Sequence, residues 1–335
     1  MRIVVTNQIF PETHKLLSAN AEVIRNSEPE PWSHELVRDQ CRDAEAVMAF
    51  MPDRIDARFI AACPRLRVIG AALKGYDNID VTAAERAGVW VTIVPDLLTV
   101  PTAELAIGLM LGLGRHVLAG DRRIRTDGFH GWRPTLYGTG LDGTRVGIVG
   151  FGRVGQAIAE RLLGFRCHIS AYDARPNSVP AHLAQAVDAV ALSDLLARSD
   201  YVVLALPLTE TTLHVIDSRA LELMKPSALL INPARGSLVD ERAIADALEA
   251  GRIAGYAADV FECEDWARTD RPSGIDARLT APGAPTLFTP HIGSAVVDVR
   301  RKIELSAAQS IIEALAGNVP TGAINKPDRQ HACST

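Results

Sequence analysis

Three side chains with complementary chemistry lie in the second half of the sequence, each shortly after an apolar run. They are Arg235, Glu264 and His291. The arginine offers a forked, permanently charged donor for an oxyanion. The histidine can move a proton near neutral pH, and a carboxylate beside it fixes its tautomer and raises its pKa. Each residue alone is also compatible with a turn cap, a surface ion pair or a solvated carboxylate, so a catalytic site is predicted only because all three can converge.

A glycine motif typical of dinucleotide sites follows the apolar run Val146–Val149. Its glycines are Gly150, Gly152 and Gly155, in the spacing G-x-G-x-x-G. The first permits a tight turn, the second lets backbone approach a pyrophosphate, and the third lets a helix pack against the strand. The helix start then presents free N–H groups and its positive dipole end to the phosphates. We therefore predict a dinucleotide site, with a purely structural turn as the alternative.

The end of the next predicted strand indicates which dinucleotide is bound. The run His168–Tyr172 is followed by Asp173. A carboxylate there can accept hydrogen bonds from the adenosine ribose hydroxyls and repels the 2′-phosphate of NADP. Arg175 follows two residues later and would partly offset that repulsion. The predicted cofactor is NAD, with NADP used at lower efficiency.

The elements that must position these residues alternate between strands and helices along the chain. Such alternation predicts parallel sheets with helices on both faces. Because the carboxyl ends of parallel strands meet at one edge of a sheet, the three candidate catalytic residues are expected to lie there together. The predicted strands are Ile3–Val5, Ala46–Phe50, Val68–Ala71, Trp90–Ile93, Val146–Val149, His168–Tyr172, Tyr201–Leu204, Ala228–Ile231, Gly255–Ala258 and Thr286–Phe288.

The order of these elements predicts an α/β protein with two doubly wound parallel-sheet domains. A smaller, flavodoxin-like substrate domain is expected at residues 1–99 and 297–335, and a Rossmann cofactor domain at residues 100–296. One long helix over Pro101–Thr126 and a last helix over Ser294–Ala316 are expected near the two boundaries. The first domain is then discontinuous, and a cleft between the domains is the expected ligand site.

Composition and charge exclude several classes of protein. The chain has 335 residues, of which 47% are hydrophobic and 22% charged, and its formal net charge is −5. This charge favours neither a nucleic-acid nor an anionic-membrane partner, and no stretch approaches the roughly 18 apolar residues of a membrane span. The scattered cysteines contain no C-x-x-C pair, so we expect no disulfide framework, no metal site and a cytoplasmic location. They are Cys41, Cys63, Cys167, Cys263 and Cys333.

Taken with the glycine motif, the candidate catalytic residues resemble the D-isomer-specific 2-hydroxyacid dehydrogenases. The resemblance covers about residues 1–320. By that resemblance Arg235 binds the substrate anion, His291 is the acid/base, Glu264 orients His291, and the protein is a homodimer. The resemblance also implies cofactor contacts from thirteen positions. These are Thr102, Gly150, Gly152, Arg153, Val154, Gly155, Asp173, Leu206, Pro207, Ala234, Asp259, His291 and Gly293. The matching segments are Gly150–Gly155, Ala205–Thr209, Asn232–Ser237, Asp259–Glu264 and Pro290–Ser294.

Two places depart from the common pattern of that family. Lys74 precedes the Gly75-Tyr-Asp-Asn78 loop where most members carry a small residue, and Asp265 follows Glu264 where most members have proline. These departures resemble the phosphonate (phosphite) dehydrogenase branch, which oxidises phosphite to phosphate. By that resemblance the substrate pocket is lined or supported by Met51, Lys74, Gly75, Trp132, Tyr137, Ser294 and Arg300.

The charge of phosphite is consistent with this interpretation. Phosphite is largely a dianion near neutral pH, whereas a 2-hydroxy acid is a monoanion, so a second cation, Lys74, beside Arg235 would favour phosphite. At about 4 Å one charge pair contributes roughly 1–4 kcal/mol. The alternatives are an ordinary D-2-hydroxyacid dehydrogenase acting on a small 2-keto acid and a dinucleotide-sensing corepressor or scaffold. Turnover by the purified protein separates an enzyme from a scaffold.

Overall fold

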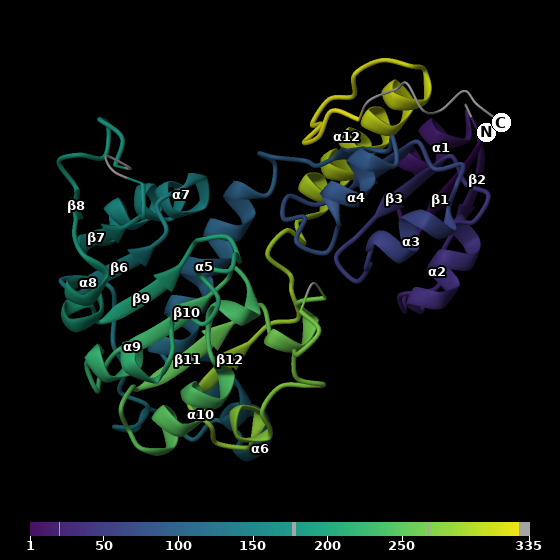
Figure 1. The fold of residues 1–335 in the computed structure, drawn as a ribbon. Coiled ribbons are helices and arrows are strands. Elements are labelled where there is room, and N and C mark those ends of the chain that lie inside the picture. Colours follow the sequence, from purple (N-terminus) through teal and green to yellow (C-terminus); the bar gives the residue numbers. More distant parts are fainter. Residues whose placement is uncertain (20, 176–178, 267, 328–335) are drawn as a thin grey trace. The chain divides into compact units, whose positions relative to one another are not determined.

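Two compact units make up the chain, which a computed structural model describes at residues 1–19, 21–175, 179–266 and 268–327 (Figure 1). The first unit contains Met1–Leu98, the short stretch Trp266–Thr269 and the chain from Ser294 onward. The second contains Thr99–Asp265 and Asp270–Gly293. The N-terminal and C-terminal parts of the sequence therefore fold together in the first unit.

The first unit is built on a five-stranded parallel sheet of order β2-β1-β3-β4-β5. This is the flavodoxin-like strand order that the sequence predicts. β2 is absent from the predicted strands because it is an edge strand with partly exposed residues rather than an apolar run. The strands are β1 (Arg2–Val5), β2 (Glu22–Arg25), β3 (Ala46–Ala49), β4 (Val68–Ala71) and β5 (Trp90–Thr92).

Helices cover both faces of this sheet. α1 (Pro11–Ser18) and α12 (Val297–Leu315) pack on one face, and Gly70 of β4 lets Ile311 of α12 approach closely, since a Cβ there would lie 2.4 Å from the isoleucine side chain. The opposite face buries a second cluster of apolar side chains under three short helices. Each of these begins at a Ser or Asp that accepts a backbone N–H, as N-capping residues do. They are α2 (His34–Cys41), α3 (Ala57–Ala62) and α4 (Val81–Arg86).

The second unit is built on a seven-stranded parallel sheet of order β12-β11-β10-β9-β6-β7-β8. The strand order reverses between β6 and β9, which is where a doubly wound sheet opens a crevice for a ligand. The predicted fold class, two doubly wound parallel sheets, is therefore confirmed. The strands are β6 (Arg145–Val149), β7 (His168–Tyr172), β8 (Val187–Ala189), β9 (Tyr201–Leu204), β10 (Leu229–Asn232), β11 (Gly255–Ala258) and β12 (Thr286–Phe288).

Two hydrophobic layers enclose this second sheet. One contains α5 (Thr99–Gly114) and α7 (Arg153–Leu162), and the other contains α8 (Leu192–Arg198), α9 (Ser218–Leu223) and α10 (Glu241–Glu249). Four shorter elements also belong to this unit. They are the 3-10 turns η1 (Leu163–Phe165), η2 (Gly236–Leu238) and η3 (Glu262–Glu264), and the helix α11 (Ala277–Thr280). Two of them lie at the candidate site: η2 directly follows Arg235 and η3 contains Glu264.

The prediction of one helix over Pro101–Thr126 is wrong. The chain forms α5 and then α6 (Val117–Asp127), bent by 58° at His116, which is left-handed with φ 53°. Gly114 is the last residue of α5, and only glycine fits there because a Cβ would lie 2.0 Å from the Tyr201 hydroxyl. Among the described residues no single helix has the length and apolar character of a membrane span; α5 and α6 meet that test only as a bent pair.

Candidate active site

The glycine motif forms the turn between β6 and α7. Gly150 is left-handed with φ +93°, and a Cβ there would lie 2.6 Å from the Ala205 carbonyl oxygen. A Cβ on Gly155 would lie 2.2 Å from the Gly150 carbonyl oxygen, so only glycine lets α7 pack so close to the strand. Gly152 has no such neighbour, because its nearest atom is Arg175 Nη2 at 3.8 Å. Packing within the protein therefore requires glycine at Gly150 and Gly155. At Gly152 the absence of a side chain leaves space beside the backbone.

That open space lies at the N-terminus of α7. Gly152 is the N-cap residue and has no capping side chain, and Arg153 and Val154 are the first residues of the helix. The first N–H groups of an α-helix point toward its N-terminal end, and the helix dipole makes this end positive. A pyrophosphate fits these donors, so the corner is compatible with the predicted dinucleotide. The predicted contacts Leu206 and Pro207 follow β9, the strand next to β6.

Asp173 lies at the end of β7 and supports the glycine turn. Its Oδ2 accepts the Phe151 N–H at 2.8 Å. Arg175 contacts the same carboxylate with Nε at 3.0 Å and Nη2 at 3.1 Å. These hydrogen bonds, led by those from Arg175, lower the pKa of Asp173 to about 2. The carboxylate is thus charged at neutral pH, and the exposed guanidinium expected to offset its repulsion of a 2′-phosphate lies beside it.

His291 and Glu264 form a direct acid–base pair. His291 Nδ1 lies 2.8 Å from Glu264 Oε2, while Glu264 Oε1 accepts the Phe261 N–H at 3.0 Å. The carboxylate is therefore held from both ends. A carboxylate at Nδ1 favours the tautomer protonated there, which leaves the lone pair of Nε2 to accept a proton from a reactant. The two side chains remain 27% and 28% exposed.

The turn that carries His291 is organised by the buried carboxylate of Asp259. Its Oδ1 accepts the Thr289 hydroxyl at 2.6 Å and the Ile292 N–H at 2.8 Å, and its Oδ2 accepts the Gly293 N–H at 2.7 Å. Burial raises the pKa of Asp259, and these bonds oppose the rise. His291 itself is left-handed, with φ 53°. The contacts place Asp259 as the support of this turn; its contact with the nicotinamide stays a prediction.

Two further predicted cofactor residues lie close to the same turn or strand edge. A Cβ on Gly293 would be 3.5 Å from the Thr102 hydroxyl oxygen, so this loop and α5 are near neighbours. Ala234 follows β10, and its N–H donates to Asn232 Oδ1 at 3.1 Å. Both residues thus lie in the second unit with the glycine turn.

Arg235 directly follows Ala234 beyond the carboxyl end of β10. Its Nη1 donates to the Ala234 carbonyl at 2.8 Å, and Asn232 Nδ2 donates to the Arg235 carbonyl at 2.8 Å. β10, β11 and β12 are adjacent in the sheet, so the segments bearing Arg235, Glu264 and His291 leave the same edge. The structure therefore brings Glu264 and His291 into contact and sets the arginine on the next strand-end loop.

The first unit gathers other predicted substrate residues at the carboxyl edge of its own sheet. Met51 follows β3, and Lys74 and Gly75 follow β4, the next strand. Arg300 of α12 reaches the same edge: its Nη1 donates to the Ala72 carbonyl at 3.3 Å. Burial lowers the pKa of this guanidinium.

A cavity of about 310 Å³ adjoins Arg300. The guanidinium lies 4.0 Å from the carboxylate of Glu304 and 5.7 Å from the centre of the Phe50 ring. Burial raises the pKa of Glu304, while the Phe10 N–H at 2.9 Å and Arg300 itself favour its charged form. The cavity is lined by Asn7, Gln8, Phe10, Phe50, Ala295, Val297, Arg300 and Glu304.

Three predicted substrate residues are not brought together with the others by the contacts of either unit. Trp132 and Tyr137 lie in the second unit after α6, and they are 81% and 76% exposed. Ser294 is the first residue of the C-terminal part of the first unit. Their part in a substrate pocket stays a prediction.

No group of three metal-ligating side chains occurs among the described residues. Cys41, Cys63, Cys167 and Cys263 are free thiols, and Cys333 lies outside the described residues. Burial raises the pKa of each of these four thiols. They are therefore poor candidates for a nucleophile.

With this geometry established, comparison with known proteins identifies the family. Residues 107–293 match the family model described as D-isomer specific 2-hydroxyacid dehydrogenase, NAD binding domain. The chain belongs to this family. The matched segment contains the glycine turn and the candidate catalytic residues Arg235, Glu264 and His291.

Relatives match both units of this 2-hydroxyacid dehydrogenase. The glyoxylate reductase of Pyrococcus furiosus is 36% identical over 330 residues, which are 97% of this chain and 95% of that protein. A solved putative D-isomer specific 2-hydroxyacid dehydrogenase from Polaromonas superposes with a TM-score of 0.86 at 29% identity and covers 97% of this chain and 99% of its own. An NADPH-dependent glyoxylate/hydroxypyruvate reductase from Sinorhizobium meliloti, solved with NADP and malonate, has a TM-score of 0.80 at 27% identity and covers 96% of each chain.

Sequence reasoning missed the buried carboxylates that support these loops. Glu241, Glu262 and Asp265 are 4%, 6% and 2% exposed and accept backbone N–H groups around η2 and η3. The one available signal was an acidic residue after Glu264 where the 2-hydroxyacid dehydrogenases usually have proline. Their bonding partners depend on how distant loops meet and are not visible in the sequence.

Proposed function

We propose that this 2-hydroxyacid dehydrogenase is an NAD-dependent phosphite dehydrogenase. The observation that carries the proposal is Lys74, a second cation that follows β4 at the same sheet edge as Met51 and Arg300. The resemblance of the Lys74 loop and of the segment after Glu264 to the phosphite-oxidising branch supports it. A dianion gains more from a second cation than a monoanion does.

In the proposed reaction the chain's own residues hold the anion and move one proton. Arg235 and Lys74 bind the phosphite oxygens and stabilise the charge that builds up as a water oxygen bonds to phosphorus. His291 Nε2 accepts one proton of that water, and the resulting imidazolium is stabilised by Glu264 at Nδ1. The hydrogen leaves phosphorus as a hydride, taking the electron pair of the P–H bond, and the product phosphate keeps the other proton of the water. The bound cofactor supplies the hydride acceptor.

A second candidate is reduction of glyoxylate or another small 2-keto acid. The specific observation in its favour is the 36% identity to a protein named glyoxylate reductase over nearly the whole chain. On this point the named relatives support the second candidate better than the first. Arg235 would then bind the substrate carboxylate, and protonated His291 would donate to the carbonyl oxygen as hydride arrives. The same pair serves both reactions, so the catalytic geometry does not separate the substrates.

A substrate comparison with the purified protein separates the two candidates. We expect NADH absorbance to rise with phosphite as sole substrate, with one phosphate released per NADH. Oxidation of D-lactate or D-glycerate, and NADH consumption with glyoxylate, should be far slower. Rapid turnover of glyoxylate with none of phosphite would overturn the phosphite proposal and leave the second candidate. No turnover of any of these substrates would favour a scaffold.

The Lys74→Ala variant tests the observation that carries the proposal. Loss of one close charge pair should raise the KM for phosphite at least about tenfold. The KM for NAD should hardly change, because Lys74 lies outside the unit that holds the glycine turn. Lys15→Ala, which removes an exposed lysine from α1, is the matched control and should leave both constants unchanged. Equal KM values for phosphite in Lys74→Ala and the control would exclude Lys74 from substrate binding.

We further propose NAD preference, a homodimer and a cytoplasmic location. The charged carboxylate of Asp173 supports NAD, while Arg175 beside it is compatible with some use of NADP. Several exposed apolar side chains on α6 and the loop after it support a self-association surface in the second unit, because exposed apolar groups can mark interfaces. They include Val117, Ile124, Phe129, Trp132, Leu136 and Tyr137. The free thiols are typical of a reducing compartment.

A further inference from the structure

The carboxylates of two adjacent residues at the end of η3, Glu264 and Asp265, contact two different loops. Glu264 Oε2 contacts His291 Nδ1 at 2.8 Å. Asp265 Oδ2 instead accepts the Ser237 N–H at 2.6 Å. Ser237 belongs to η2, the turn that directly follows Arg235. One short segment therefore touches both the acid–base pair and the loop of the substrate cation.

The η2 turn is held on η3 by more than this one bond. A Cβ on Gly236 would lie 1.9 Å from the Phe261 carbonyl carbon, so the two backbones are in direct contact. The Ser237 carbonyl accepts the His214 N–H at 2.8 Å, and Ser237 itself is fully buried. With Asp265 on its N–H, both backbone polar groups of Ser237 have partners in a buried site. Removing the carboxylate would leave a buried N–H without its acceptor.

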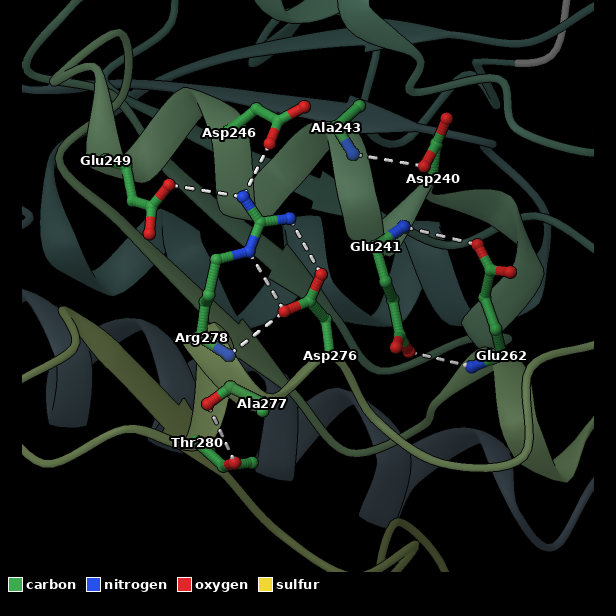
Figure 2. Close-up of polar contacts among 10 residues, drawn as sticks. All are labelled: Asp240, Glu241, Ala243, Asp246, Glu249, Glu262, Asp276, Ala277, Arg278 and Thr280. Carbon is green, nitrogen blue, oxygen red and sulfur yellow. Dashed lines mark hydrogen bonds and ion pairs between the residues drawn. The ribbon is translucent and has the colours of Figure 1, made fainter.

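A reciprocal pair of glutamates fixes the other side of η3. Glu262 Oε1 accepts the N–H of Glu241 at 3.2 Å, and Glu241 Oε1 accepts the N–H of Glu262 at 2.8 Å. Figure 2 shows these two bonds running in opposite directions between the start of α10 and η3. These bonds attach η3 to α10, the helix that follows η2. The segment that carries Asp265 is therefore itself held in place.

We propose that Asp265 is a positioning residue that sets the Arg235 loop relative to the Glu264–His291 pair. The inference rests on the proposed role of Arg235 as the substrate cation. An apolar side chain at this position would have no acceptor for the Ser237 N–H. The Asp265 carboxylate therefore links the loop that carries Arg235 to the segment that carries Glu264. A shift of the η2 turn would also move Arg235, because the Arg235 carbonyl oxygen accepts the Leu238 N–H at 3.3 Å across the same turn.

Steady-state kinetics of Asp265→Ala and Asp265→Asn test this role. The alanine variant should raise the KM for the oxyanion substrate, phosphite or glyoxylate, by about tenfold, the effect of one charge-assisted hydrogen bond. The KM for NAD should stay within about twofold, and the asparagine variant should recover part of the loss because its amide oxygen can still accept the N–H. Asp56→Asn is the matched control, since Asp56 caps α3 of the first unit through the Phe59 N–H at 2.9 Å and should affect stability alone.

Hydrogen exchange of the peptide spanning residues 232–240 gives a readout that needs no substrate. We expect faster exchange there in Asp265→Ala than in the unmodified protein, and no change in Asp56→Asn. Unchanged exchange at residues 232–240, or equal rises in the KM for oxyanion and for NAD, would overturn the positioning role. If the unmodified protein turns over no oxyanion while exchange still responds to Asp265→Ala, the proposed function fails and the structural link remains.

Discussion

The two corners of the second unit are built by opposite means. At the cofactor corner, Gly150 and Gly155 remove side chains so that backbone can approach backbone, with gaps that a single Cβ would fill. At the catalytic corner, Asp259 and Asp265 use side-chain carboxylates to hold backbone N–H groups of neighbouring loops, and Glu264 holds an N–H of its own turn. The first corner leaves donors at a helix end for a ligand. The second uses its carboxylates to fix the loops that carry His291 and Arg235.

This difference predicts how each corner responds to substitution. A glycine turn has no side chain to lose, so added atoms damage it through steric overlap. A carboxylate corner is damaged by removing an acceptor, because buried N–H groups then lose their partner. Additions should therefore weaken cofactor binding, and deletions should weaken catalysis.

The largest effect is expected from His291→Asn at the catalytic corner. The variant removes the group that exchanges a proton through Nε2, and general acid–base catalysis contributes roughly 10²–10⁴ in rate. The kcat should fall by about that factor, while the dissociation constant for NADH, measured by fluorescence titration, should stay within about threefold. A kcat near that of the unmodified enzyme would remove His291 from the mechanism and break the contrast between the corners.

The pH dependence of stability should report the buried carboxylates of the catalytic corner. Burial, with Glu262 nearby, raises the pKa of Glu241 from 4.5 to about 7. The folded chain thus binds this proton more tightly than the unfolded chain does. Its contribution to stability is complete below about pH 4.5 and is lost as pH rises through about 7. The full loss corresponds to roughly 3 kcal/mol at 1.36 kcal/mol per pH unit.

Glu241→Gln isolates that contribution, because the amide keeps an oxygen acceptor for the Glu262 N–H and does not titrate. Urea unfolding at pH 5 and pH 8 should show a smaller loss of unfolding free energy in the variant than in the unmodified protein. Asp53, whose pKa burial raises to about 6, contributes equally to both proteins and cancels in the comparison. Identical losses in the two proteins would show that Glu241 does not change protonation over this range.

How far the sequence predicts the molecule also differs between the corners. The apolar runs of the central strands locate most strands within one residue, whereas the edge strands β2 and β8 lack such runs and were missed. The glycine motif can be recognised in the sequence because Gly150 and Gly155 meet local steric requirements of the turn. The hydrogen-bond donors to Asp259 and Asp265 cannot be predicted from the sequence, because they depend on which distant loop packs against each carboxylate. Residue types at the catalytic corner were therefore predictable, but their supporting bonds were not.

Gly155→Ala should damage the cofactor corner by overlap with the Gly150 carbonyl, which lies 2.2 Å from the new Cβ position. Overpacking of this kind costs typically about 1–3 kcal/mol. We expect a lower melting temperature and NADH binding weakened about tenfold. Gly164→Ala is the matched control, since a Cβ there meets nothing within 4 Å. Equal NADH affinity in the two variants would contradict the steric account of this corner.

The smallest effect is expected at Asp173, whose carboxylate lies at the cofactor corner. It accepts the Phe151 N–H of the glycine turn and pairs with Arg175. Asp173→Ala removes the acceptor for the ribose hydroxyls and the charge that repels a 2′-phosphate, and it leaves the arginine available to that phosphate. The ratio of kcat/KM for NADP to that for NAD should rise by several-fold, mostly through the KM values.

Asp173→Asn keeps an acceptor for the Phe151 N–H but not the charge, so it separates support of the glycine turn from repulsion of the 2′-phosphate. If both variants raise the ratio equally, the charge decides cofactor choice; if only alanine does, the turn does. An unmodified enzyme equally efficient with both cofactors would show that Asp173 sets no preference and that Arg175 already cancels its charge.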